Sequence, residues 1–253
     1  MKIYFEKAVL FLHAFPLNSN MYKYQFEALE KENIPYIAVD YPGFGETPVF
    51  PTFKDIKQYT DYIVSKLYEN KIKKVVAVGD SMGGYIMFDV WKRHREIAEG
   101  FVFVSTRAQA DTEEAKKTRM ATIEKIKNEG KSFLIEAMLD AQTSPSTKKD
   151  SKKMKELECI MNQATEEGII NALTALANRE DNRDILKDIN IPTIVVAGKD
   201  DEKVTPPEIV KEISDGIPDA KFYEIENSAH LPPFENPTRF NELLIEFLKE
   251  INF

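Results

Sequence analysis

Cysteine and histidine are scarce in this sequence, which has one Cys and three His among its 253 residues. The single cysteine, Cys159, cannot form an internal disulfide, and so few side chains leave little material for a Cys/His zinc site. We therefore expect no metal site, and the low cysteine content fits a reducing compartment. Cys159 itself is expected to be a small, buried apolar residue.

An excess of basic residues is also missing, because 34 Lys and Arg stand against 42 Asp and Glu, a net charge of −8. Binding to a phosphate backbone needs the opposite balance, so we expect no nucleic-acid partner. No uninterrupted apolar run approaches the roughly 20 residues that span a bilayer. Glu6 and Lys7 interrupt the apolar residues near the amino terminus, which leaves no signal-peptide core. These absences predict a cytoplasmic protein without a membrane partner.

Short runs of β-branched and aromatic residues recur along the chain, and their continuous apolar character predicts strands covered on both faces. These runs are residues 8–12, 36–39, 75–78, 101–104, 193–197 and 222–225. Between them, apolar residues at three- and four-residue spacing predict helices. The helical patterns are residues 21–31, 53–70, 83–95, 207–215 and 237–249. The alternation predicts an α/β fold with a doubly wound, mostly parallel sheet.

One long segment breaks this alternation. Two strand-free stretches, residues 112–139 and 149–177, combine dense charge with helical apolar spacing. At about 150 residues per domain, the chain length corresponds to between one and two domains. We expect a core domain of residues 1–106 and 184–253, and a helical cap of residues 107–183 over the carboxyl edge of the sheet, where open α/β folds bind ligands. A purely structural helical appendage is the alternative.

The strongest chemical signal is the segment Gly79-Asp80-Ser81-Met82-Gly83-Gly84, between a predicted strand and a predicted helix. A nucleophilic serine on such a tight turn needs strained backbone, and glycines on both sides remove side chains that would collide there. The helix start adds free N–H groups and a positive dipole end, which favour the negative charge that develops in acyl transfer. Ser81 is therefore the candidate nucleophile, with an ordinary structural turn as the alternative.

A nucleophilic serine needs a base, and three histidines are available. His94 lies among basic residues near the end of the predicted helix 83–95, where a cation suits the helix dipole and solvent. His230 follows the last predicted strand in a loop that continues into prolines, so it is the candidate base; a solvated loop histidine is the alternative. His13 ends the first strand and is expected to tether its loop by hydrogen bonds rather than to bind a metal.

The base in turn needs a carboxylate that fixes its tautomer and stabilises the imidazolium. In this class of elbow the acid lies between the nucleophile and the base in the chain, here between Ser81 and His230. Asp200 and Asp201 stand at the end of the fifth predicted strand, and one of them should face the histidine. The other aspartate and Glu202 are expected to be turn and surface acids.

An oxyanion hole completes such a site. The N–H of Met82, which follows the nucleophile, could pair with an N–H of the loop His13-Ala14-Phe15-Pro16. That loop resembles the His-Gly-x-Pro loop of the α/β-hydrolase superfamily, and Asp40-Tyr41-Pro42-Gly43-Phe44-Gly45-Glu46-Thr47 resembles its Asp-x-Pro-Gly-x-Gly-x-Ser/Thr loop. Outside the cap, the whole chain is similar to the esterase and lactonase branch that includes 3-oxoadipate enol-lactonases.

The resemblance implies further details of the site and of the fold. It implies that the Phe15 N–H is the second oxyanion donor, and that the acid is Asp201 rather than Asp200, three residues after the glycine that ends the strand. Residues 229–237 are similar to the family's Gly-His-x-x-x-x-Glu-x-Pro segment. Family members begin with an antiparallel hairpin, but only residues 1–7 are available here, so the hairpin should be absent or cut to one short edge strand.

These motifs predict a serine hydrolase, a carboxylesterase that forms an acyl-enzyme through Ser81, His230 and Asp201 and needs no metal or organic cofactor. The expected partner is a small-molecule ester or lactone, and the oligomeric state stays open. A lactonase with the same three residues is the first alternative. Perhydrolase or haloperoxidase-like chemistry is a weaker one, and a non-catalytic binding protein on the same fold is the last.

Some side chains outside these motifs have a structural and a functional interpretation. An apolar stripe in the cap could face the pocket, although core packing is the expected role at helical spacing: Phe133, Leu134, Met138 and Leu139. A group of lysines could attract an acidic substrate, although a solvated helix face is expected: Lys148, Lys149, Lys152, Lys153 and Lys155. Trp91 is expected to pack the helix that follows the elbow.

Overall fold

The computed structural model describes residues 5–51 and 53–253, and its six strands form one sheet in which all neighbours are parallel. The order across the sheet is β2-β1-β3-β4-β5-β6. The strands are β1 (Lys7–Leu12), β2 (Tyr36–Val39), β3 (Lys74–Asp80), β4 (Ala98–Val104), β5 (Thr193–Gly198) and β6 (Lys221–Ile225). Each coincides with a predicted run, so the predicted α/β class and doubly wound sheet are confirmed.

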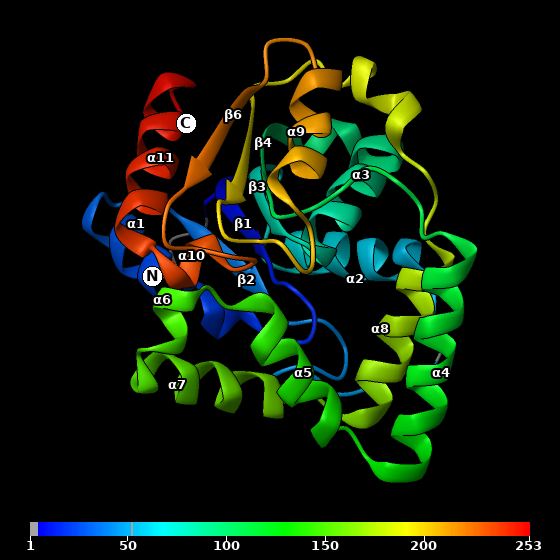
Figure 1. Ribbon diagram of the computed structural model, residues 1–253. Coiled ribbons are helices and arrows are strands. Elements are labelled where there is room, and N and C mark those ends of the chain that lie inside the picture. Colours follow the sequence, from blue (N-terminus) through cyan, green and yellow to red (C-terminus); the bar gives the residue numbers. More distant parts are fainter. Residues whose placement is uncertain (1–4, 52) are drawn as a thin grey trace.

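Helices cover both faces of the sheet, with α1 and α11 on one side and α2, α3 and α9 on the other (Figure 1). These helices are α1 (Lys23–Lys31), α2 (Ile56–Glu69), α3 (Met82–His94), α9 (Pro207–Gly216) and α11 (Pro237–Glu250). Every residue of β5 is buried as a result, which explains the continuous apolar run in its sequence. The edge strands β2 and β6 are only partly buried.

The start of α2 and the segment before β1 differ in how far they match the predictions. The predicted helix 53–70 begins instead at Ile56, because the side chain of Asp55 accepts the N–H of Lys57 at 2.8 Å and caps the helix there. No strand precedes β1 among the described residues. The predicted loss or shortening of an amino-terminal hairpin concerns residues 1–7, of which residues 1–4 lie outside the described part of the chain.

Five α-helices lie between β4 and β5 in the chain, and Figure 1 shows them gathered at the end of the sheet toward which the arrows of β5 and β6 point. They are α4 (Glu113–Glu129), α5 (Ser132–Gln142), α6 (Pro145–Lys148), α7 (Ser151–Asn162) and α8 (Glu166–Asn178). Each of the two long helical stretches predicted here is broken. Gly130, with φ of 79°, ends α4, and the Thr165 side chain caps α8 by accepting the Gly168 N–H at 3.0 Å.

Of two packing predictions, the one for Trp91 is confirmed and the one for Cys159 is wrong. Trp91 of α3 is buried and packs edge-on against Phe101 at 6.1 Å between ring centroids, which confirms its packing role. Cys159 is exposed, so the prediction of a buried cysteine is wrong. Leu157 and Ile160 occupy the buried face of α7, and Cys159 lies between them on the outward side of the helix.

Membrane-spanning helices and metal-binding groups are absent from the described residues. None of the described helices is both long and apolar enough to cross a bilayer. Within residues 5–51 and 53–253, no three His, Cys, Asp or Glu side chains lie together in a way that could hold a metal ion.

Candidate active site

Ser81 occupies the turn between β3 and α3 with φ of 51° and ψ of −105°. A left-handed φ at a non-glycine residue costs about 1–2 kcal/mol, so the flanking elements must hold it. A Cβ on Gly79 would lie 2.6 Å from the carbonyl carbon of Gly83, and a Cβ on Gly83 would lie 2.2 Å from the oxygen of Leu12. Only glycine fits at both positions, which explains sterically why glycines flank the serine in the sequence.

His230 and Asp201 are both buried, and Nδ1 of His230 lies 2.6 Å from Oδ2 of Asp201. Burial alone would raise the pKa of Asp201, but the charge of His230 and the hydrogen bonds to the carboxylate lower it below its ordinary value. The ionised carboxylate accepts a hydrogen bond from Nδ1–H, and in a neutral imidazole ring this leaves Nε2 of His230 as the unprotonated nitrogen. Nε2 is buried without a hydrogen-bond partner among the described residues, so it is free to accept a proton.

Asp201, and not Asp200, is the aspartate that lies against His230. Its carboxylate also accepts two backbone N–H groups, from Val204 at 3.1 Å and from Thr205 at 3.2 Å. The turn after β5 therefore fixes the carboxylate in one orientation, whereas Asp200 is only half-buried and contacts neither ring nitrogen of His230.

A buried carboxylate, Glu235, fixes the loop that carries His230. Its Oε1 accepts the N–H groups of Ala229 at 2.7 Å and Leu231 at 3.3 Å, on either side of the histidine. Its Oε2 accepts the N–H of Ser144, just before α6, at 2.7 Å. Glu235 thus connects the histidine loop to the segment between α5 and α6.

Gln142, the last residue of α5, contacts both the histidine loop and the predicted oxyanion loop. Its side-chain Nε2 donates to the carbonyl of Phe15 at 2.7 Å, and its own carbonyl accepts the His230 N–H at 3.1 Å. The N–H groups of Phe15 and Met82 make no hydrogen bond to another described residue. Both are therefore free to donate to a bound group.

His13 holds the start of the oxyanion loop, in agreement with the expected tether. Its Nε2 accepts the Tyr41 N–H at 3.1 Å, and its Nδ1 lies 3.0 Å from the Ala14 carbonyl. Burial lowers the pKa of His13 to about 4, against a smaller opposing effect of Asp40, so the ring is neutral. Ala14, which stands where the family usually has glycine, does not have a positive φ.

One cavity of about 430 Å³ brings several of these residues together. Ser81, His230 and Phe15 line it on the side of the sheet, and α4, α5 and α8 supply much of the remaining lining. A larger open groove of about 740 Å³ lies between α1 and α11, but none of the predicted site residues lines it. The 430 Å³ cavity is therefore the candidate active site.

A sequence model described as the alpha/beta hydrolase fold matches residues 7–237. The chain belongs to the α/β-hydrolase fold family. Membership supports hydrolysis as the general class of activity. The predicted branch with enol-lactonases is supported only loosely, since the solved enol-lactonase from Burkholderia xenovorans LB400 is 21% identical and shows the shared fold alone, with a TM-score of 0.86 over 97% of this chain and 92% of that chain.

Relatives of this α/β-hydrolase match over nearly its full length. The AB hydrolase superfamily protein YisY of Bacillus subtilis (strain 168) is 26% identical, over 95% of this chain and 91% of that protein. The solved structure of a thermophilic esterase from Thermogutta terrifontis, with malate bound, is 31% identical with a TM-score of 0.92, over 97% of this chain and 90% of that chain. The esterase EaEST from Exiguobacterium antarcticum is 25% identical with a TM-score of 0.85, over 98% and 93% of the two chains.

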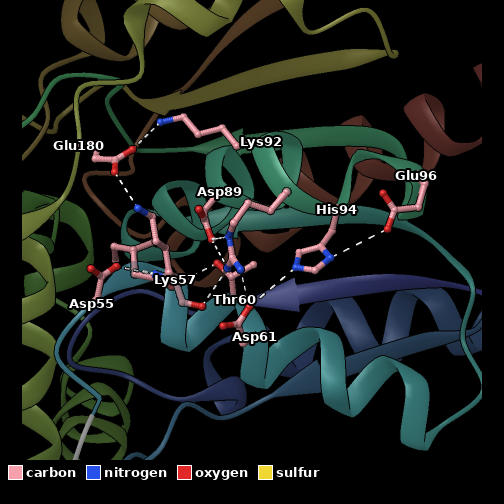
Figure 2. A network of polar contacts seen from close by, with 11 residues as sticks. Asp55, Lys57, Thr60, Asp61, Asp89, Lys92, His94, Glu96 and Glu180 are labelled. Atoms are coloured by element: carbon pink, nitrogen blue, oxygen red, sulfur yellow. Dashed lines mark hydrogen bonds and ion pairs between the residues drawn. The ribbon is translucent and has the colours of Figure 1, made fainter.

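The third histidine of this α/β-hydrolase lies away from the cavity. His94 ends α3, whereas Ser81 precedes its first residue, and 13 helical residues separate them by about 20 Å. Figure 2 shows His94 between two acids, 3.8 Å from Asp61 and 3.9 Å from Glu96. It belongs to a polar network on α2 and α3, in which Lys92 contacts Glu180 at 3.0 Å.

The apolar stripe and the lysine group of the predicted cap differ in their position relative to the cavity. Leu134 and Met138 of the apolar stripe line the cavity, whereas Phe133 and Leu139 pack partly buried against the core. None of the five lysines of residues 148–155 lines the cavity, in line with the expected solvated face. Four of the cavity-lining residues that sequence reasoning missed carry polar or charged side chains that matter below: Arg107, Arg119, Gln142 and Arg179. Glu235 could have been found, because it is the glutamate of the His-x-x-x-x-Glu segment.

Proposed function

We propose that this α/β-hydrolase cleaves carboxylic esters through an acyl-enzyme, with Ser81 as nucleophile, His230 as base and Asp201 as its orienting acid. The N–H groups of Phe15 and Met82 hold the oxyanion. The esterase titles of the Thermogutta and Exiguobacterium structures support esters as the substrate class. The reaction needs no group beyond these residues and water.

The observation that carries the proposal is the 2.6 Å contact between Nδ1 of His230 and Oδ2 of Asp201, with Nε2 unbonded in the cavity that Ser81 lines. A buried carboxylate against Nδ1 fixes the tautomer in which Nε2 accepts protons. His13, by contrast, has a hydrogen-bond partner at each ring nitrogen, which suits its tethering role.

The first half-reaction acylates the serine. The Ser81 oxygen bonds to the ester carbonyl carbon while its proton passes to Nε2 of His230. The carbonyl electrons move to oxygen, where the N–H groups of Phe15 and Met82 stabilise the charge; losing one such donor costs roughly 3–4 kcal/mol. The intermediate then collapses, the bond to the alkoxide breaks, and the proton on Nε2 passes to the departing alcohol.

The second half-reaction regenerates the enzyme. Nε2 of His230 takes a proton from water as the water oxygen bonds to the acyl carbon. Collapse of this second intermediate releases the carboxylic acid, and the proton on Nε2 returns to the Ser81 oxygen. Throughout the cycle Asp201 stays ionised and stabilises the imidazolium.

The same proposal assigns different roles to two parts of the chain. Residues 1–106 and 184–253 form the catalytic core, and residues 107–183 form a cap that shapes the substrate side of the cavity. The contacts of Gln142 with the oxyanion and histidine loops, and the lining supplied by α4, α5 and α8, support this division.

Hydrolysis of p-nitrophenyl butyrate by the wild type and by Ser81→Ala tests the proposal. We expect kcat to fall by about 10⁶-fold, as for loss of the nucleophile in other serine hydrolases, with an unchanged circular dichroism spectrum. Ser65→Ala, at an exposed position on α2, is the matched control and should retain wild-type turnover. Unchanged turnover in Ser81→Ala would remove Ser81 as nucleophile, and a series of lactones assayed in parallel separates esterase from lactonase preference.

A further inference from the structure

The candidate cavity has an excess of positive charge, although the whole chain carries a net charge of −8. Among its described lining residues there is one carboxylate, Asp111, and four cationic side chains: Arg107, Arg119, Arg179 and Lys203. Lys203 shares its ion-pair partner Asp140 with Lys148, so that pairing does not neutralise it fully. The net charge of the cavity lining is thus positive, whereas that of the whole protein is negative.

Asp111 is already neutralised by Arg179. Nη1 of Arg179 lies 2.5 Å from Oδ1 of Asp111, and the side chains are only 3% and 5% exposed. Arg179 is also fixed by hydrogen bonds to the carbonyls of Gln109 and Leu176, and its guanidinium lies 4.5 Å from the ring centre of Tyr85. These contacts give Arg179 a structural role and balance the charge of Asp111.

Arg119 of α4 is the surplus cation of this cluster. Its Nε lies 2.5 Å from Oδ2 of Asp111, so two guanidinium groups share a single carboxylate. Its side chain is 26% exposed, far more than that of Arg179. Asp111, Arg119 and Arg179 together therefore carry one net positive charge, and Arg119 is the more exposed of the two arginines.

Arg107 adds a second unbalanced charge. Its Nη2 donates to the carbonyl of Val204 and to Oγ1 of Thr205 at 3.3 Å, and both acceptors are neutral. No carboxylate lies within ion-pair distance of Arg107 in the part of the chain that the structure describes. Apolar residues such as Leu134, Met138 and Leu173 complete the wall, which lowers the local dielectric and strengthens attraction for an anion.

We propose that the substrate is an ester that also carries a carboxylate, and that Arg119 and Arg107 bind this carboxylate while the ester group lies at Ser81. The inference rests on the proposed function, whose substrate class it narrows. A guanidinium matches a carboxylate with two parallel N–H donors, so arginine suits this role better than lysine. A cation left unpaired in a mostly apolar cavity is costly, and a bound anion removes that cost.

Calorimetric binding to the Ser81→Ala variant tests the inference without requiring turnover. The two probes are monomethyl glutarate and methyl 4-carbamoylbutanoate, which have nearly the same shape but differ in charge. We expect the anionic ester to bind at least about tenfold tighter, because a charge-assisted hydrogen bond is stronger than one to a neutral amide. Equal affinities for the two probes would overturn the inference.

Variants locate the charge that matters. In the Ser81→Ala background, Arg119→Gln should remove most of the tenfold preference, and Arg119→Lys, which keeps the charge but loses the planar donors, should retain part of it. Arg239→Gln removes one positive charge from α11, outside the cavity, and should keep the full preference. A preference that persists in Arg119→Gln, or that disappears in Arg239→Gln, contradicts the assignment.

The two proposals fail in distinguishable ways. If the wild type hydrolyses p-nitrophenyl butyrate but Ser81→Ala binds both probes equally, the carboxylate inference is wrong and the esterase proposal stands. If Ser81→Ala prefers the anionic probe but the wild type hydrolyses neither the probes nor p-nitrophenyl butyrate, the proposed function is wrong.

Discussion

Nδ1 of His230 lies 2.6 Å from Oδ2 of Asp201, and both side chains are buried. The two residues stand 29 positions apart, in loops after β5 and β6 that are neighbours in the sheet. The turn after Asp201 orients the carboxylate through two backbone N–H groups, and Glu235 holds the backbone on both sides of His230. The contact is therefore built into the ends of two adjacent parallel strands.

Replacing this carboxylate by an amide tests its role. Asp201→Asn should lower kcat by about 10⁴-fold, because an amide N–H facing Nδ1 favours the tautomer in which Nε2 is protonated. Asp200→Asn changes the neighbouring aspartate, which does not contact His230, and should stay within a few-fold of wild type. Steady-state hydrolysis of p-nitrophenyl butyrate measures both, and the reverse ranking would reassign the acid.

Loss of the Gln142 side chain should weaken both the fold and the rate. Gln142→Ala leaves the buried Phe15 carbonyl without its donor, so we expect the free energy of unfolding to fall by about 1–3 kcal/mol. Because the oxyanion loop loses this contact, kcat should fall by about tenfold while KM changes little. Asn128→Ala, at an exposed amide on α4 that donates to the Glu124 carbonyl of the same helix, is the control. Equal kcat values for the two variants would show that Gln142 does not position the loop.

Asp80, directly before the nucleophile, should destabilise the protein at neutral pH. It is fully buried, and neither carboxyl oxygen has a partner among the described residues. Burial, together with the charges of Asp201 and Glu235, raises its pKa well above the ordinary 3.8. The folded state therefore keeps its proton while the unfolded state loses it, so stability falls as pH rises above 3.8.

The variant Asp80→Asn removes that penalty. Its free energy of unfolding should exceed that of wild type at neutral pH, and the difference should shrink as pH falls and vanish well below 3.8, where the carboxyl is protonated in both states. Denaturant titrations at several pH values measure this. Parallel stability profiles for wild type and variant would mean that Asp80 is ionised in the folded protein.

His13 has the opposite sign of pH dependence. Its pKa is lowered from 6.5 to about 4 by burial, so the unfolded state binds a proton in this range that the folded state does not. Stability should be fully present above pH 6.5 and fall by about 3 kcal/mol as pH drops to about 4. In His13→Gln this part of the pH dependence should be lost. An NMR titration that gave His13 a pKa near 6.5 would contradict the account.

Much of the fold was predictable because its signals are local. Each strand is a short apolar run, since helices cover both faces of the sheet. The turn around Ser81 can be recognised by glycines at positions where a Cβ would collide with neighbouring atoms. The choice of Asp201 over Asp200 depended on family spacing, because two adjacent aspartates in a turn look alike in a sequence.

The rest depends on contacts between distant residues. Gln142 lies 127 positions from Phe15, and nothing in its local sequence distinguishes it from other glutamines. The pairing of Asp111 with Arg179 likewise joins the segment before α4 to the segment after α8. The outward position of Cys159 follows from which face of α7 is buried, and that is decided by packing on neighbouring helices.

Covalent labelling by a fluorophosphonate tests the central claim most directly, because the reagent reacts with a serine only when a base activates it. We predict a single phosphonyl adduct, located at Ser81 by peptide mass spectrometry, that forms in parallel with loss of esterase activity. The adduct should be absent in Ser81→Ala and slowed by orders of magnitude in Asp201→Asn. Esterase activity that persists with Ser81 unlabelled would contradict the account.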